Sequence, residues 1–249
     1  MVHCLRMRYT EPTNGDAKCT EKFCLDQPLD GEAETGFNFA DNANWRIFRI
    51  MAEFINGFEF LAPLRREVTF FGSARFTPGS HWYNEAQELA STLASNGFTI
   101  ITGGGPGIME AGNRGAHDVD GESIGLDIEL PTEQRRNPYV KKGIGFHYFF
   151  TRKVMLSASA QAYVFFPGGF GTLDEFFEMV TLVQTEKMEH VPMVCVGKDY
   201  WHGLDDWLRG TVLDKYSAIG DTDPSLYTIV DTAAEAYELI KDSKERKYF

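Results

Sequence analysis

The sequence has few cysteines and few positive charges, and each shortage argues against a class of protein. Its four cysteines are Cys4, Cys19, Cys24 and Cys195, and none belongs to a C-x-x-C pair. A structural zinc site therefore has little support, and Cys195 is expected to be a small buried thiol in an apolar run. The chain has 24 Lys and Arg against 36 Asp and Glu, a formal net charge of -12. This balance argues against nucleic-acid and anionic-membrane surfaces, which both need clustered cations.

The sequence also lacks long apolar runs and internal repeats. No stretch approaches the ~20 uninterrupted apolar residues of a membrane span. The start of the chain has no clean apolar core of the kind found in secretory signals. We therefore expect a soluble, cytoplasmic protein whose cysteines are reduced. The 249 residues, of which 43% are hydrophobic, suffice for one α/β domain with a full core.

Three segments are predicted from composition and periodicity. Residues 1–40 are polar and without period, which is typical of a flexible arm. Residues 41–63 are predicted to contain a helix, and residues 64–249 one Rossmann-like domain. The apolar residues of this helix recur three or four positions apart, at Trp45, Phe48, Met51, Ala52, Ile55 and Phe58. We expect the helix to pack on the core or on a partner chain.

From residue 68 onward, apolar strand-like runs alternate with helical patterns. The predicted strands are 68–71, 98–102, 123–128, 146–150, 162–166, 192–196 and 226–230, and residues 131–143 are predicted to be a polar, basic connection. Strands that alternate with helices indicate an α/β fold, a doubly wound parallel sheet with helices on both faces. Ligands of such sheets bind at the carboxyl ends of the strands.

Two glycine-rich turns, Gly103–Gly107 and Gly168–Gly171, each lie between a predicted strand and a predicted helix. Glycine lets the backbone approach a ligand closely, and the unpaired N–H groups that begin a helix favour an anion. The expected ligand is a phosphate. Neither turn is a known nucleotide fingerprint, because Ile108 replaces the third glycine of G-x-G-x-x-G and no Lys-Ser/Thr follows Gly112.

The second turn also has a purely structural explanation. Thr172 and Glu175 fit a capping box, in which Thr172 caps the following helix and Glu175 returns a hydrogen bond to it. Such a cap contributes about 0.5–2 kcal/mol, which is sufficient reason for both residues without any chemistry. The presence of two glycine-rich turns favours the phosphate site.

The motifs resemble one known family. The stretches Gly103–Glu110, Arg152-Lys153 and Pro167–Glu175 are similar to the Lonely Guy (LOG) family, long mislabelled lysine decarboxylase-like, and the motif PGGxGTxxE is highly specific. The similarity runs from about residue 68 to 201. The arm and the first helix lie outside the shorter plant-type members and are more similar to a bacterial branch.

The resemblance implies a Rossmann-like homodimer, or a higher even oligomer, that hydrolyses nucleoside 5'-monophosphates to a free base and ribose 5-phosphate. Some members release a cytokinin. By resemblance, Arg152 and Glu175 match the catalytic pair, and Glu133 matches an acidic residue of a variable loop. The implied substrate-binding residues are Gly72, Ser73, Gly104, Gly105, Met109, Lys153, Gly168, Gly169, Gly171, Thr172 and Thr181. The partner is a small-molecule nucleotide.

The two residue types of this pair suit the cleavage of an N-glycosidic bond. Cleavage of an N-glycosidic bond builds positive charge at the sugar C1', so a carboxylate such as Glu175 stabilises the transition state and can orient water. Phosphate and Glu175 repel each other, and Arg152 is the candidate cation between them. No lysine can be singled out for pyridoxal chemistry, and we expect neither a cofactor nor a metal. The alternative is a nucleotide or phosphorylated-cofactor carrier on the same fold.

Overall fold

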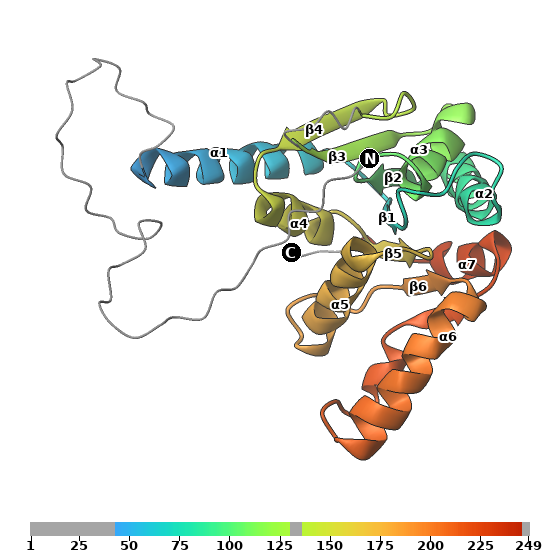
Figure 1. The fold of residues 1–249 in the computed structure, drawn as a ribbon. Coiled ribbons are helices and arrows are strands. Elements are labelled where there is room, and N and C mark those ends of the chain that lie inside the picture. Colours follow the sequence, from blue (N-terminus) through green and yellow to red (C-terminus); the bar gives the residue numbers. More distant parts are fainter. Residues whose placement is uncertain (1–42, 130–135, 246–249) are drawn as a thin grey trace, which may run out of the picture. The chain divides into compact units, whose positions relative to one another are not determined.

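A computed structural model of the chain describes residues 43–129 and 136–245 (Figure 1). The predicted arm, its three cysteines and Glu133 lie outside these ranges. The strands are β1 (Glu67–Phe71), β2 (Thr99–Thr102), β3 (Ser123–Ile128), β4 (Lys142–Phe146), β5 (Ala162–Phe165), β6 (Met193–Val196) and β7 (Thr228–Val230). The helices are α1 (Ala43–Leu61), α2 (His81–Ser95), α3 (Ile108–Asp118), α4 (Phe149–Ala158), α5 (Phe170–Gln184), α6 (Lys198–Trp207) and α7 (Ala233–Ile240), and a π-helical segment, Leu208–Lys215, continues α6.

The strands of the described chain form one parallel sheet in the order β4-β3-β2-β1-β5-β6-β7. The chain first winds from β1 outward to β4, then crosses back to β5, which pairs with the other edge of β1. The switch point of the topology therefore lies between β1 and β5. Loops on its two sides diverge there, which opens a crevice at the carboxyl ends of the strands.

Helices cover both faces of the sheet (Figure 1). Buried residues of α2, α3 and α7 join one apolar cluster with one face of the central strands. Residues of α4, α5 and α6 join a second cluster on the opposite face, and the side chains Phe54, Phe60 and Leu61 of α1 pack against it. Every residue of β2, β5 and β6 is buried, as expected for strands covered on both sides. The predicted doubly wound α/β fold is thus confirmed.

The segment around the fourth strand was predicted wrongly. Residues 146–150 were expected to be a strand, but β4 is Lys142–Phe146 and α4 already begins at Phe149. The aromatic run Phe146–Phe150 resembles a strand by composition alone. β4 lies at the edge of the sheet and is half-exposed, so it carries Lys142 and glycines in place of a continuous apolar run.

The helix expected before the sheet is α1, and it belongs to the same compact unit as the sheet. It packs closely at Gly57, where an added Cβ would lie 2.5 Å from Sδ of Met155 in α4. Its outer side chains Trp45, Phe48 and Met51 are exposed. No helix among the described residues is long and apolar enough to cross a bilayer.

Candidate active site

A cavity of about 1120 Å³ opens at the carboxyl ends of β1, β2, β3 and β5. It straddles the switch point between β1 and β5, where the fold class predicts a ligand. Of the residues proposed from the sequence, those that line it are Gly72, Ser73, Gly104, Gly105, Met109, Arg152, Gly168, Gly169, Gly171, Thr172 and Glu175. Both glycine-rich turns thus contribute to one cavity, although more than sixty residues separate them in sequence.

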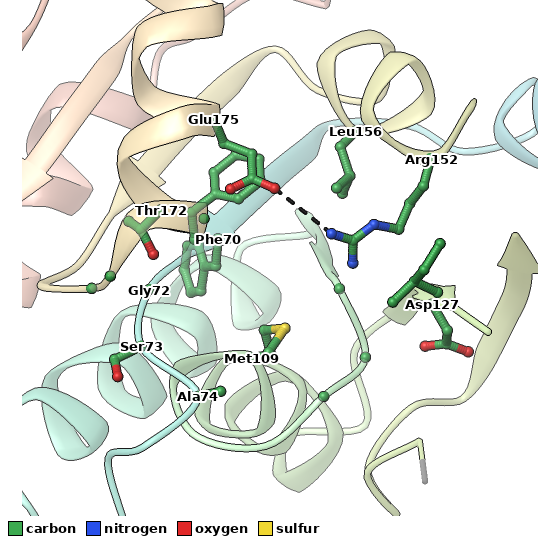
Figure 2. Close-up of a pocket in the computed structure, with 18 of the residues that line it drawn as sticks. Phe70, Gly72, Ser73, Ala74, Met109, Asp127, Arg152, Leu156, Thr172 and Glu175 are labelled. Atoms are coloured by element: carbon green, nitrogen blue, oxygen red, sulfur yellow. Dashed lines mark ion pairs between the residues drawn. The ribbon is translucent and has the colours of Figure 1, made fainter. Parts of the chain in front are cut away.

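Glu175 and Arg152 meet within this cavity (Figure 2). Glu175 lies in the second turn of α5 and Arg152 in the first turns of α4, and Nη2 of Arg152 is 3.7 Å from Oε1 of Glu175. Their side chains are only 14% and 10% exposed. The Arg152 guanidinium also lies 5.8 Å from the ring centre of Phe149. Among the described residues, Nε of Arg152 has no hydrogen-bond partner.

Burial shifts the protonation of both groups. Desolvation raises the pKa of the Glu175 carboxyl to about 7, and the positive charge of Arg152 partly offsets this. Desolvation also lowers the pKa of the Arg152 guanidinium, while Glu175 and then Asp127 raise it. A carboxyl with a pKa near 7 can hold and release a proton at neutral pH, as general acid–base catalysis requires.

The alternative explanation of Thr172 and Glu175 as a capping box is wrong. The N-cap of α5 is Gly169, and no side chain caps the helix. Glu175 is therefore placed one turn inside α5, with its carboxylate beside Arg152 and not folded back on the helix start. Thr172 is buried against Gly168, where an added Cβ would lie 2.1 Å from Oγ1 of Thr172.

The turn after β1 joins the two glycine-rich turns. The backbone N–H of Ser73 donates to the carbonyl of Pro167 at 3.0 Å, and the N–H of Ile108 donates to the carbonyl of Ser73 at 3.0 Å. Gly107 has φ +71°, and an added Cβ would lie 2.3 Å from the carbonyl oxygen of Ser73. Ser73 is thus bonded through its backbone to both loops, which sets their distance across the cavity.

One ion pair of the cavity, next to β3, was not predicted from the sequence. Asp127, at the carboxyl end of β3, pairs with Arg136, and both line the cavity. Burial raises the pKa of the Asp127 carboxyl, and Arg136 opposes the rise. Its Oδ1 fills the space beside Gly104, which has φ +70°. A polar residue at the end of a buried strand, two positions beyond Gly125, is the signal that could have indicated it.

Two residues proposed from the sequence lie outside the lining of this cavity. Lys153 pairs with two carboxylates of α5: its Nζ donates to Asp174 at 2.7 Å and lies 3.4 Å from Glu178. Thr181 is exposed and lies six residues after Glu175 in α5, and its carbonyl accepts a hydrogen bond from Thr185. Neither residue lines the cavity, although the charge of Lys153 acts on the Glu175 carboxyl and lowers its pKa.

Solved structures support the fold. The molybdenum cofactor carrier protein of Chlamydomonas reinhardtii matches with a TM-score of 0.52 at 21% identity, over 71% of this chain and 96% of that one. The molybdenum cofactor binding protein of Rippkaea orientalis matches with a TM-score of 0.51 at 22% identity, over 70% and 93%. At these identities the likeness shows the fold alone.

Curated proteins are similar in sequence. The cytokinin riboside 5'-monophosphate phosphoribohydrolase LOG of Oryza sativa subsp. japonica is 32% identical over 48% of this chain and 50% of its own length. LOG3 of Arabidopsis thaliana, of the same activity by name, is 27% identical over 73% and 82%. The pyrimidine/purine nucleotide 5'-monophosphate nucleosidase of Escherichia coli K12 is 27% identical over 66% and 39%. The matched region thus spans half of the rice protein and less of the bacterial one.

One family model matches residues 109–240, more than half of the chain, and its description is "Possible lysine decarboxylase". The matched range includes Arg152, Glu175 and the second glycine-rich turn. The named relatives are phosphoribohydrolases and a nucleosidase that act, by name, on nucleotide 5'-monophosphates. With the family model and these relatives in agreement, the chain belongs to the "Possible lysine decarboxylase", or LOG, family.

Proposed function

We propose that the protein hydrolyses the N-glycosidic bond of nucleoside 5'-monophosphates, such as AMP and cytokinin riboside 5'-monophosphates, to a free base and ribose 5-phosphate. The observation that carries this proposal is the buried Glu175 carboxylate 3.7 Å from Arg152, in a cavity edged by two glycine-rich turns. Family membership supports it, because the named relatives act on such nucleotides.

In this proposal the turn Gly168–Gly171 holds the phosphate. α5 begins at Phe170, directly within the turn, so its first N–H groups and the positive end of its dipole favour an anion there. An added Cβ at Gly169 would meet no atom within 4 Å, so the backbone is open to a close ligand. Glu175 lies about one helical turn past this glycine-rich turn, so the ribose of a nucleotide whose phosphate is held there would lie close to the Glu175 carboxylate.

The proposed reaction uses the two buried charges. The bond between C1' and the base nitrogen breaks, its electron pair leaves with the base, and a water oxygen bonds to C1'. The Glu175 carboxylate stabilises the positive charge at C1' and accepts the proton that the water loses, which then passes to the base. Arg152 holds Glu175 in place and offsets its repulsion from the phosphate.

The proposal is tested by incubating the purified protein with AMP and separating the products by chromatography. We expect adenine and ribose 5-phosphate in equal amounts, and no product from adenosine, which lacks the phosphate. Calorimetry with AMP distinguishes the carrier alternative. Tight binding without release of a base from any purine or cytokinin nucleotide would favour the carrier and contradict hydrolysis. Sedimentation of the same preparation tests the expected even oligomer.

A further inference from the structure

α1 is an addition to the alternating α/β core, yet one of its side chains reaches the start of α4. Glu53 lies on the inner, half-buried side of α1. Its Oε1 accepts a hydrogen bond from the backbone N–H of His147 at 3.0 Å, and its Oε2 accepts one from the N–H of Tyr148 at 3.3 Å. Oε2 also accepts the hydroxyl hydrogen bond of Thr151 at 2.6 Å. One carboxylate of α1 thus contacts a segment that lies 94 or more residues later in the sequence.

The three donors belong to the junction between β4 and α4. α4 begins at Phe149, and its N-cap residue Tyr148 supplies no capping side chain. The first N–H groups of a helix lack intrahelical partners, and a negative charge beside them is stabilised by the helix dipole. Glu53 therefore caps α4 from another helix: it binds the N–H of the N-cap residue Tyr148, the N–H of His147 before it and the Thr151 hydroxyl, and so fixes where the first turn of α4 begins.

Arg152 is the residue that this arrangement places. It directly follows Thr151, whose side chain is fully buried and hydrogen-bonded to Glu53. Its own guanidinium has an ion pair with Glu175 but no hydrogen-bond partner for Nε among the described residues. The position of the guanidinium beside Glu175 therefore depends also on where the backbone of α4 places residue 152. A rotation of the first turn of α4 would carry Arg152 away from Glu175.

The contact between the two helices is tight enough to transmit this position. Gly57, one turn after Glu53 on α1, is buried against Met155 of α4, and an added Cβ would lie 2.5 Å from Sδ of Met155. The same Cβ would lie 3.3 Å from the ring of Phe146, the last residue of β4. α1 is thus held against both elements that flank the junction, with Glu53 directed at the junction itself.

We propose that Glu53 is a positioning residue for catalysis, which caps α4 from α1 and thereby holds Arg152 against Glu175. The expected effect on turnover rests on the proposed function, whereas the expected displacement of Arg152 from Glu175 does not. α1 is then part of the active-site architecture. In the proposed function the nucleotide phosphate is held by α5 and the β5 loop, whereas the hydrogen bonds of Glu53 go to the start of α4. Substitution of Glu53 should therefore change kcat more than KM.

The kinetic test compares Glu53→Ala, Glu53→Gln and Glu59→Ala with the wild type on AMP. Glu59 is an exposed carboxylate on the same helix and serves as the matched control. We expect Glu53→Ala to lower kcat by about ten- to a hundredfold, as small misplacements of catalytic groups do, with KM changed by less than about threefold. Glu53→Gln keeps a side-chain acceptor and should retain most of kcat. In an Arg152→Ala background, Glu53→Ala should cause no further loss.

A second test needs no turnover. Arg152 is the largest of the nearby charges acting on the Glu175 carboxyl, followed by Asp174 and Lys153. If Glu53→Ala releases Arg152, the Glu175 carboxyl should titrate at higher pH in ¹³C NMR, with Glu175→Gln used to assign the resonance. Glu53→Gln should leave this titration close to that of the wild type. Thermal melting and circular dichroism show whether each variant is folded; should Glu53→Ala be unfolded, Thr151→Val, which removes the hydroxyl that donates to Glu53, replaces it in the titration.

The outcomes separate the two proposals. Absence of turnover in the wild type, together with a shifted Glu175 titration in the Glu53 variant, would contradict hydrolysis and support the positioning role. Turnover in the wild type with an unshifted titration, or with equal losses in the Glu53 and Glu59 variants, would overturn the positioning role. A loss that is as large in the Arg152→Ala background as in the wild type would overturn it too.

Discussion

The guanidinium of Arg152 and the carboxylate of Glu175 approach to 3.7 Å from two different helices on the same face of the sheet. Each side chain is more than four-fifths buried, so each charge depends on the other for compensation. Burial of a lone charge is costly, and removal of one partner leaves the other unpaired in a poorly solvated site. The pair therefore links the proposed chemistry to protonation and to stability.

Replacement of either member of the pair should abolish most activity. We expect Glu175→Gln and Arg152→Ala each to lower turnover of AMP by a factor on the order of 10² or more, because each removes a group that stabilises developing charge. Steady-state release of adenine provides the measurement, with circular dichroism as the control for folding. Turnover at the wild-type rate in both variants would contradict the site.

The rate should depend on pH near neutrality. The pKa of the Glu175 carboxyl is raised to about 7, mainly by burial, and the proposed role needs the ionised form. Turnover should therefore rise as pH increases through about 7. In Arg152→Ala, the residual activity should rise only at higher pH, because Arg152 lowers the pKa of Glu175. A rate that is flat between pH 5 and about 8 would show that another group controls the reaction.

The same pKa has a consequence for stability. The carboxyl of Glu175 has a higher pKa in the folded chain, about 7, than its ordinary value of 4.5, so the folded state holds the proton more tightly. Its stabilising contribution is fully present below about pH 4.5 and is lost as pH rises through about 7, by roughly 3 kcal/mol in total. The free energy of unfolding of the wild type relative to Glu175→Gln should fall over this interval. Urea denaturation at several pH values measures the difference, and a constant difference would refute the shift.

Replacement by alanine should destabilise the fold at one glycine of the cavity and leave it unchanged at another. At Gly104, φ is +70° and an added Cβ would lie 1.7 Å from Oδ1 of Asp127, so Gly104→Ala should destabilise the fold by more than about 1 kcal/mol. At Gly169, φ is -102° and an added Cβ meets nothing within 4 Å, so Gly169→Ala should fold normally.

Gly169→Ala should nevertheless weaken substrate binding. If the backbone of this turn contacts the phosphate, a methyl group there blocks the close approach, and KM for AMP should rise by about tenfold or more. Thermal denaturation and steady-state kinetics on the two glycine variants provide the comparison. An unchanged KM in Gly169→Ala would place the phosphate elsewhere in the cavity.

Much of the fold follows from local sequence signals. Apolar runs predicted most strands and glycines predicted their turns, because buried parallel strands are continuously apolar and sharp turns need backbone freedom. The prediction failed at 146–150, where an aromatic run suggested a strand but the edge strand β4 ends at Phe146. An edge strand is half-exposed, so it lacks the continuous apolar run from which the buried strands were predicted.

The sequence by itself determined the α/β alternation, the two glycine-rich turns at strand ends and the family resemblance, since all of these depend on residue types at short spacing. Only the tertiary structure decided that Glu175 faces Arg152 and does not cap its own helix. It also decided that Oδ1 of Asp127 occupies the space beside Gly104, and that Glu53 of α1 caps α4. These contacts join residues from separate helices and strands, and they are set by how the layers pack on the sheet, which no local spacing encodes.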